Sequence, residues 1–189
     1  MDILKEVMNR KSPLVFKEDD VEKQKIDTLV EAARWAPSCF NKQPWKYVFV
    51  HKKDSSRESL ESALSLGNWW AKRAPYLVAV GAIPDEACRT NGLPYYAYDL
   101  GLSVMTLTIE AEHQGLRVHQ MAGWKEENVK KALGFPDNYR VVVVFALGYE
   151  GEARRIWDKL EERVKERLSQ PRRRNPKTEN FFFGVFGRS

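Results

Sequence analysis

Apolar side chains recur every three or four positions in several stretches of the chain, a spacing typical of amphipathic helices. The stretch that ends at Pro37 has this spacing, and Asp19 or Asp20 can cap the start of its helix. Residues 98–114 are apolar on more than one face, so we expect a buried helix there, with Gly115 as its C-cap. The same pattern predicts further helices over residues 2–9, 55–65, 126–133 and 157–168.

Three shorter stretches are apolar almost throughout and are predicted to be strands. They cover residues 45–50, 76–83 and 141–147. Because helices separate them, we expect three to five strands in a layered α+β or α/β domain. A chain of 189 residues is long enough for one such core, and we expect a single domain over residues 1–189.

The hydropathy pattern gives no sign of a membrane segment. The longest apolar run, residues 141–147, is far shorter than the roughly 20 residues that span a bilayer. Residues 1–11 hold no apolar stretch of signal-peptide length. These features predict a cytoplasmic protein with no membrane partner.

The two cysteines, Cys39 and Cys88, are too few for a disulfide framework or a four-cysteine zinc site. Cys39 lies in a polar loop and could be a reactive thiol, but no histidine is near it in the sequence. We therefore favour a small buried side chain at this position.

The composition is that of a globular protein, with 43% hydrophobic and 30% charged residues. The net charge is +5, and residues 150–189 hold four of those five charges, centred on Arg172–Arg174. This local excess fits an anion site better than a basic face. The chain ends in an apolar run, NFFFGVFGRS, which must pack somewhere. One option is an added edge strand on another subunit, which would make the protein an obligate dimer.

Familiar catalytic motifs are absent from the sequence. It contains no GxGxxG, no Walker-type loop and no GxSxG. His51, His113 and His119 do not have the spacing of metal ligands, so we expect no metal site.

Three polar clusters remain as candidate chemistry. They are Arg10-Lys11-Ser12, the stretch from Pro37 to Trp45, and Arg172–Arg174. Arginine forks and a serine hydroxyl suit a phosphate, because each fork offers two parallel hydrogen bonds. Asn41 and Gln43 carry both donors and acceptors, which suits the edge of a heteroaromatic ring. For any one cluster alone, a solvated turn is the favoured interpretation.

Taken in order, these segments resemble the FMN-dependent nitroreductase family. The resemblance rests on Arg10-Lys11-Ser12 with Phe16, on ARWAPSCFNKQPWKYVFV, and on the Asp99-Leu100-Gly101 start of the long helix. It continues through GLRVHQMAGW, LGFPDNYRVVVVFALGY and the Arg-x-Arg-x-Pro ending at Pro176. It implies an α+β sandwich with a central mixed or antiparallel sheet flanked by helices, in an intertwined homodimer. It further implies one FMN at each of two subunit interfaces, with residues 172–189 wrapping the partner subunit.

The resemblance also assigns residues to the cofactor. Those implied for FMN binding are Arg10, Lys11, Ser12, Pro37, Ser38, Asn41, Gln43, Met121, Ala122, Gly123, Arg172 and Arg174. In the segment Met121–Gly123 a backbone N–H is implied to face the hydride-accepting nitrogen of the flavin. Phe40 and Trp124 are candidates for the substrate cleft, although for Phe40 alone a place in the core or at the dimer interface is favoured.

The implied activity is an NAD(P)H-dependent flavin oxidoreductase that reduces a small nitroaromatic or quinone by a ping-pong mechanism. Since the flavin carries the hydride, no catalytic side chain is expected, and neither is a nucleic-acid partner. Alternatives are reductive dehalogenation or flavin breakdown on the same scaffold, and a flavin-binding or nucleic-acid-binding module without turnover.

Two residues depart from the family pattern. Asn175 stands where a lysine is common, and Trp124 replaces the usual phenylalanine. Trp69-Trp70 and Tyr95-Tyr96 are further candidates for the cleft, although we favour a place in the core or at the dimer interface for each.

Overall fold

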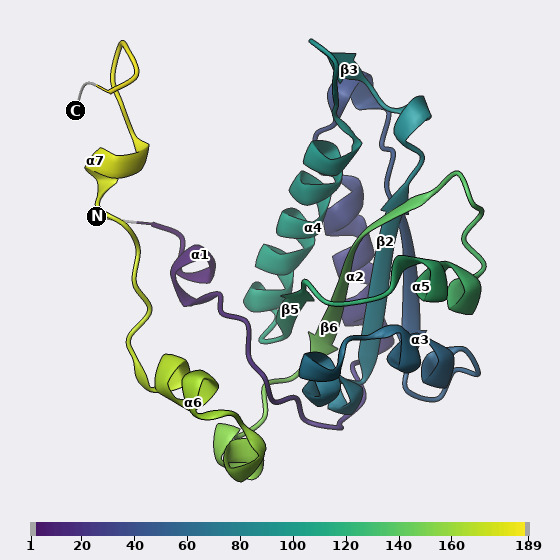
Figure 1. Ribbon diagram of the computed structural model, residues 1–189, viewed down its shortest axis with the longest axis vertical. Helices are drawn as coiled ribbons and strands as arrows, with labels where there is room; N and C mark the ends of the chain where they lie inside the picture. The colour runs from purple at the N-terminus through teal and green to yellow at the C-terminus, as the bar shows by residue number, and fades with distance from the viewer. Residues whose placement is uncertain (1–2, 188–189) are drawn as a thin grey trace. The chain divides into compact units, whose positions relative to one another are not determined.

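A computed structural model describes residues 3–187 of the chain (Figure 1). The chain divides into two compact units, Met1–Ala153 and Arg154–Ser189. Within residues 3–187, none of the helices is both long and apolar enough to cross a membrane.

The first unit is built on a four-stranded sheet with the order β1–β2–β6–β5. The strands are β1 (Lys46–His51), β2 (Tyr76–Ala82), β5 (Arg117–Met121) and β6 (Arg140–Gly148). Every pair of neighbours is antiparallel, which confirms the predicted antiparallel sheet. Two short strands, β3 (Arg89–Thr90) and β4 (Leu93–Pro94), form a separate hairpin.

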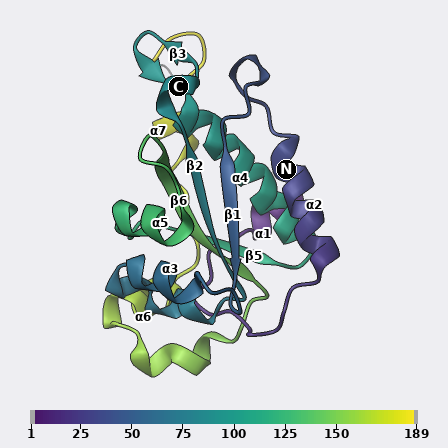
Figure 2. The ribbon, with the colours of Figure 1, turned by 90° about the vertical axis from the view of Figure 1, so that its right-hand side faces the viewer.

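Helices cover both faces of this sheet. Figures 1 and 2 show α2 and α4 on one side and α3 and α5 on the other. The helices of this unit are α1 (Lys5–Asn9), α2 (Lys23–Arg34), α3 (Arg57–Ala63), α4 (Tyr96–His113) and α5 (Glu126–Leu133). The 3₁₀ helices η1 (Cys39–Asn41), η2 (Leu66–Arg73) and η3 (Pro84–Glu86) lie between them. This arrangement confirms the predicted α+β fold.

The register of the sheet explains why its central strands are apolar throughout. Val78 pairs with Phe145, and both belong to one core cluster with Leu29 of α2 and Leu107 of α4. The neighbouring positions point to the opposite face of the sheet and are just as well buried. A strand that is covered on both faces needs no polar position, and β6 has this pattern after its exposed first residue, Arg140.

Several helix boundaries follow the sequence signals closely, although Gln114, and not Gly115, is the C-cap of α4. α5 has the predicted bounds and ends at Gly134, whose φ of +70° is a conformation that glycine adopts readily. The expected cap of α2 by Asp19 or Asp20 is wrong, because Glu22 occupies the N-cap. Asp20 instead accepts hydrogen bonds from His51 at 2.9 Å and Lys53 at 3.0 Å. These bonds hold the pKa of the Asp20 carboxyl far below its usual range.

The second unit contains η4 (Ala153–Lys159), α6 (Glu162–Ser169) and α7 (Lys177–Asn180). The single helix predicted over residues 157–168 is therefore wrong. The Leu160 N–H donates to the carbonyl of Trp157 at 3.1 Å at the end of η4, and Glu161 is extended with ψ of 146° before α6 begins. Among residues 154–187 the tail forms α7 and no strand, so the edge strand on a second subunit stays a prediction.

The two cysteines form a disulfide, with their Cα atoms 6.1 Å apart. Both expectations for Cys39, a reactive thiol or an isolated buried side chain, are therefore wrong. The reason is tertiary: the turn after α2 meets the segment after β2, which lies 49 residues further along the chain. Nothing in the spacing of two cysteines reveals such a meeting.

Replacing both cysteines with serine is expected to lower the free energy of unfolding by about 2–4 kcal/mol. A cross-link between residues 49 apart restricts the unfolded chain, and its loss removes that restriction. Urea unfolding followed by circular dichroism measures the change, with the parent protein in a reducing agent as the matched control. Equal urea midpoints for the oxidised parent, the reduced parent and the variant would contradict the assignment.

Candidate functional site

An apolar hollow of about 390 Å³ lies between the first half of α4 and the end of β5. Its lining residues are Leu100, Gly101, Val104, Gln120, Met121, Ala122, Trp124, Val142 and Val143. Three of them, Met121, Ala122 and Trp124, are residues that the sequence singled out. A mostly apolar hollow of this volume suits a flat, largely apolar group.

Gly101 contributes open space to this hollow. A Cβ at Gly101 would have no atom within 4 Å, so the glycine is not required by packing within the chain. Gly123 is the opposite case, because its Cβ would lie 2.9 Å from Oγ of Ser65 and 3.1 Å from Nδ2 of Asn68. The backbone at Gly123, in the segment predicted to face the flavin ring, thus packs directly against residues 65–68.

The loop after α2 is held in an unusual backbone conformation. Phe40, Asn41 and Gln43 all have positive φ values of 48°, 55° and 47°. Non-glycine residues adopt such values at an expense of about 1–3 kcal/mol each, so surrounding contacts must impose them. The Ser38 hydroxyl accepts the Gln43 N–H at 2.9 Å, and the Gln43 amide donates to Oδ1 of Asn41 at 3.1 Å.

Two longer-range contacts anchor this loop. Cys39 donates its N–H to Oδ1 of Asp99 at 3.2 Å, and its sulfur is bonded to Cys88. Asp99 is buried in the first turn of α4. Phe40, in contrast, is 92% exposed, and Pro37 is exposed as well. The loop therefore presents Phe40 and its polar neighbours outward from a fixed base.

The N-terminal basic cluster lies near the beginning of β5, because Lys11 and Arg117, the first residue of the strand, both pair with Glu150. The carbonyl of Pro13 lies 2.7 Å from Nδ1 of His119, which fixes the chain next to this strand. Arg10 reaches Oγ of Ser12 at 3.5 Å, and Lys11 forms an ion pair with Glu150 at 2.8 Å. Arg10 and Ser12 stay close enough to act together on one anion.

Within one chain, this cluster and the loop 37–44 are far apart. The cluster follows α1, where Glu6 bonds His113 in the last turn of α4, whereas the loop is anchored at Asp99 in the first turn. Those turns are separated by about 20 Å along a helix that rises 1.5 Å per residue. The loop also leads into β1, at the opposite edge of the sheet from β5.

The C-terminal arginines belong to the second unit. Arg172 and Arg174 are exposed there, and Arg174 donates to the carbonyl of Arg173 at 2.8 Å. Their predicted place beside the N-terminal cluster stays a prediction.

The candidate aromatic residues have different environments. Trp70 is buried and lies 4.3 Å from the ring of His119 and 6.2 Å from that of Phe16, so it belongs to the core as favoured. Tyr96 packs partly buried against the core cluster. Of the two residues assigned to the cleft, Trp124 lines the hollow and Phe40 lies on the exposed loop.

Two partly buried groups of this unit, Tyr47 and Glu126, have shifted pKa values. Burial raises the pKa of Tyr47, whose hydroxyl bonds Ser103 of α4 at 2.8 Å. Partial burial of Glu126 disfavours its charge. The Arg140 guanidinium and the Val141 N–H outweigh that effect, and the pKa of Glu126 lies below its ordinary value.

Sequence reasoning missed Asn68, Gln120 and the anchoring role of Asp99. Asn68 donates from Nδ2 to the carbonyl of Gly123 at 2.8 Å, across 55 residues of sequence. A contact over that separation leaves no local pattern, so only the fold reveals it.

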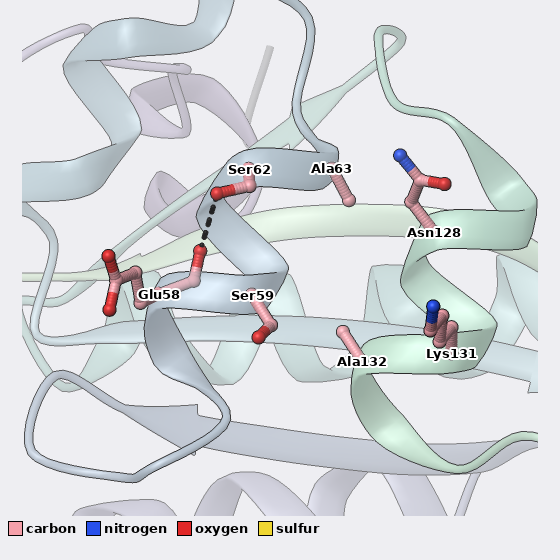
Figure 3. Close-up of a pocket in the computed structure, with 7 residues that line it drawn as sticks. All are labelled: Glu58, Ser59, Ser62, Ala63, Asn128, Lys131 and Ala132. Atoms are coloured by element: carbon pink, nitrogen blue, oxygen red, sulfur yellow. Dashed lines mark hydrogen bonds between the residues drawn. The ribbon is translucent and has the colours of Figure 1, made fainter.

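A second groove, of about 580 Å³, lies between α3 and α5 (Figure 3). Its lining residues are Glu58, Ser59, Ser62, Ala63, Asn128, Lys131 and Ala132. Apart from Ala63, these are side chains at the surface of the two helices, and Ser62 bonds its own helix at the Glu58 carbonyl. Unlike the hollow beside β5, this groove is lined by none of the residues that the sequence analysis assigned to FMN or to the cleft.

Gly123→Ala is expected to lower the free energy of unfolding by about 1–3 kcal/mol, because its Cβ would force residues 65–68 away. Gly101→Ala is the matched control. It adds the same methyl group in open space within a helix, and it should stabilise the protein by up to about 1 kcal/mol. Urea unfolding of both variants measures the difference. Equal effects at the two positions would contradict the tight contact at Gly123.

Comparison with known proteins gives three concordant matches. The model of the nitroreductase family matches residues 7–91 and 66–149. An uncharacterized 15.4 kDa protein of Mycolicibacterium smegmatis is 37% identical over 134 residues, covering 71% of this chain and 86% of its own. An NADH dehydrogenase of Thermus thermophilus is 25% identical over 179 residues, covering 77% of this chain and 85% of its own.

The crystal structure of an FMN-containing oxidoreductase is similar over the whole chain. The TM-score is 0.85 at 26% identity, with 100% of this chain and 95% of the other covered.

Proposed function

The chain belongs to the nitroreductase family, and on that premise we propose that it is an FMN-dependent oxidoreductase. It uses NADH or NADPH to reduce a small electrophile, such as a nitroaromatic compound or a quinone. The observation that carries the proposal is the hollow beside β5, lined by Met121, Ala122 and Trp124. It lies in a chain whose fold matches an FMN-containing oxidoreductase over its full length.

The residues around β5 fit FMN at both ends of the strand. The hollow at its end is mostly apolar, and the missing side chain of Gly101 leaves open space there. Arg10 and Ser12, at its beginning, offer a guanidinium and a hydroxyl of the kind that binds phosphate. The five residues of β5 span roughly 17 Å, which suits an elongated ligand with its phosphate at one end and its ring at the other.

When bound, FMN supplies the hydride chemistry, so the protein needs no acid or nucleophile of its own. The chain binds the phosphate with Arg10, Ser12 and, in this proposal, Arg172 and Arg174. Met121, Ala122 and Gly123 support the ring, while Trp124 and Phe40 shape the cleft for the two substrates. Because nicotinamide and electrophile would use the same cleft in turn, ping-pong kinetics are expected.

The working form in this proposal is a homodimer. The loop with Pro37, Ser38, Asn41 and Gln43 is about an α4 length away from the N-terminal cluster of its own chain. A second copy would bring its loop to the first copy's β5, and residues 172–189 would wrap around that partner. Exposed apolar side chains on α4 and before and within α1 support such an interface: Ile3, Leu4, Val7, Met8, Tyr98 and Met105.

The proposal predicts a yellow protein whose flavin absorbance bleaches when NADH or NADPH is added without oxygen. A visible absorption spectrum before and after each addition is the measurement. A flavin spectrum that resists both donors would move the function to a binding module without nicotinamide turnover. A colourless protein that also refuses added FMN would exclude the proposed function.

Arg10→Ala is expected to weaken FMN binding by about 1.5–3 kcal/mol, or roughly 10- to 150-fold, since it removes a charge-assisted hydrogen bond. Arg174→Ala should have an effect of similar size. Titration of the apoprotein with FMN gives the dissociation constants. Lys23→Ala, which removes the same charge from the exposed start of α2, is the control. If the arginine variants bind FMN as tightly as this control, the phosphate assignment is wrong.

A further inference from the structure

The segment that continues β5 is held from one side by a small group of hydrogen bonds. The carbonyl of Gly123 accepts two of them, from the Ser65 N–H at 3.0 Å and from Nδ2 of Asn68 at 2.8 Å. The Asn68 N–H in turn donates to the carbonyl of Ser65 at 2.8 Å. Ser65, Asn68 and Gly123 thus form a closed ring of hydrogen bonds, which we call the Gly123 clamp.

The residues on either side of the clamp extend it into a short antiparallel bridge. Lys125 donates its N–H to the carbonyl of Ala63 at 2.8 Å, and Leu64 lies opposite Trp124. In this pattern the flanking residues make the hydrogen bonds, so the backbone N–H and C=O of Trp124 point away from Leu64. The hydrogen bonds of residues 123–125 to residues 63–65 therefore determine that the backbone groups of Trp124 face the opposite side.

Ala122 is fixed between two points of attachment. Met121, before it, belongs to the sheet through its pairing with Val144, and Gly123, after it, is held by the clamp. Ala122 itself is exposed and lines the hollow. A single residue between two fixed neighbours has little freedom, so the sheet and the clamp together restrict the backbone of Ala122.

We propose that Asn68 is a positioning residue for the flavin, which holds the backbone of Met121–Gly123 in the orientation that meets the ring. This inference rests on the proposed function, because it takes the hollow to be the ring site. Asn68 is the one member of the clamp that acts through its side chain, since Ser65 and Gly123 contribute backbone groups. It is therefore the member that substitution can remove while the backbone stays intact.

The side chain of Asn68 combines two properties that the position requires. Its amide supplies a donor that matches the Gly123 carbonyl, and its short side chain fits the close approach that a Cβ on Gly123 would obstruct. An aspartate has the same shape but presents a carboxylate oxygen to that carbonyl, so it would push the segment away. An alanine removes the bond and leaves the Ser65 N–H as the remaining donor.

The test compares Asn68→Ala and Asn68→Asp with the parent protein. Three quantities are measured: the dissociation constant for FMN, the midpoint potential of the bound flavin, and the free energy of unfolding of the apoprotein. Loss of one neutral hydrogen bond should weaken FMN binding about five- to tenfold in Asn68→Ala. Binding in Asn68→Asp should be weaker still, and the midpoint potential should shift in both variants.

The relative FMN affinities of Asn68→Ala and Asn68→Asp distinguish a positioning role from a role in packing alone. A role in packing alone predicts that aspartate, which keeps the volume of asparagine, is tolerated better than alanine. Positioning predicts the reverse. Asn128→Ala is the matched control, because it makes the same change in the groove between α3 and α5 (Figure 3) and should leave the FMN constant and the potential unchanged.

The inference is overturned if the parent binds FMN and both Asn68 variants keep its affinity and potential. It is also overturned if their apoproteins lose stability while the potential of the bound flavin does not move. A parent that refuses FMN is a different result, since it removes the proposed function and the inference together.

Discussion

The site depends on the antiparallel pairing of β5 with β6. β6 is almost completely buried, and it fixes β5 at the edge of the sheet with Met121 opposite Val144. That register places the start of β5 near the N-terminal basic cluster, where Lys11 and Arg117 share Glu150, and its end at the hollow. A slip of one residue would turn every side chain of β5 to the other face and separate these two features. The geometry of the site is thus a by-product of forming the core.

Most of the fold could be predicted from local patterns, because most of its elements are stabilised by their own apolar faces. α5, with Gly134 after its last residue, and the buried strand β6 are clear examples. Apart from the local break at Glu161 before α6, prediction failed where distant parts of the chain meet. The Cys39–Cys88 bond joins positions 49 apart, Asn68 reaches Gly123 across 55, and Asp20 turns from a capping role to His51. The resemblance to a known family identified the segments of the site, whereas only the structure shows the contacts between them.

The length of α4 separates two sets of polar groups that the sequence assigned to one ligand. Its first turn anchors the loop with Asn41 and Gln43, and its last turn bonds α1 just before Arg10. A rigid helix of 18 residues keeps these two sets of polar groups about 20 Å apart along its axis. In a pair of chains related by two-fold symmetry, each helix would act as a spacer that offers complementary halves to its partner.

The disulfide also changes what a break in the chain would do. Residues 40–87 lie within the covalent ring that it closes, and they include η2, where Leu66 is 94% exposed and Gly67 is exposed beside it. A protease that cuts between these two residues would produce two fragments that stay joined through sulfur. The cut protein would keep its full mass on a non-reducing gel and separate into two bands only after reduction. Asn68 would then be the second residue of the C-terminal fragment, which the disulfide keeps attached to the rest of the chain.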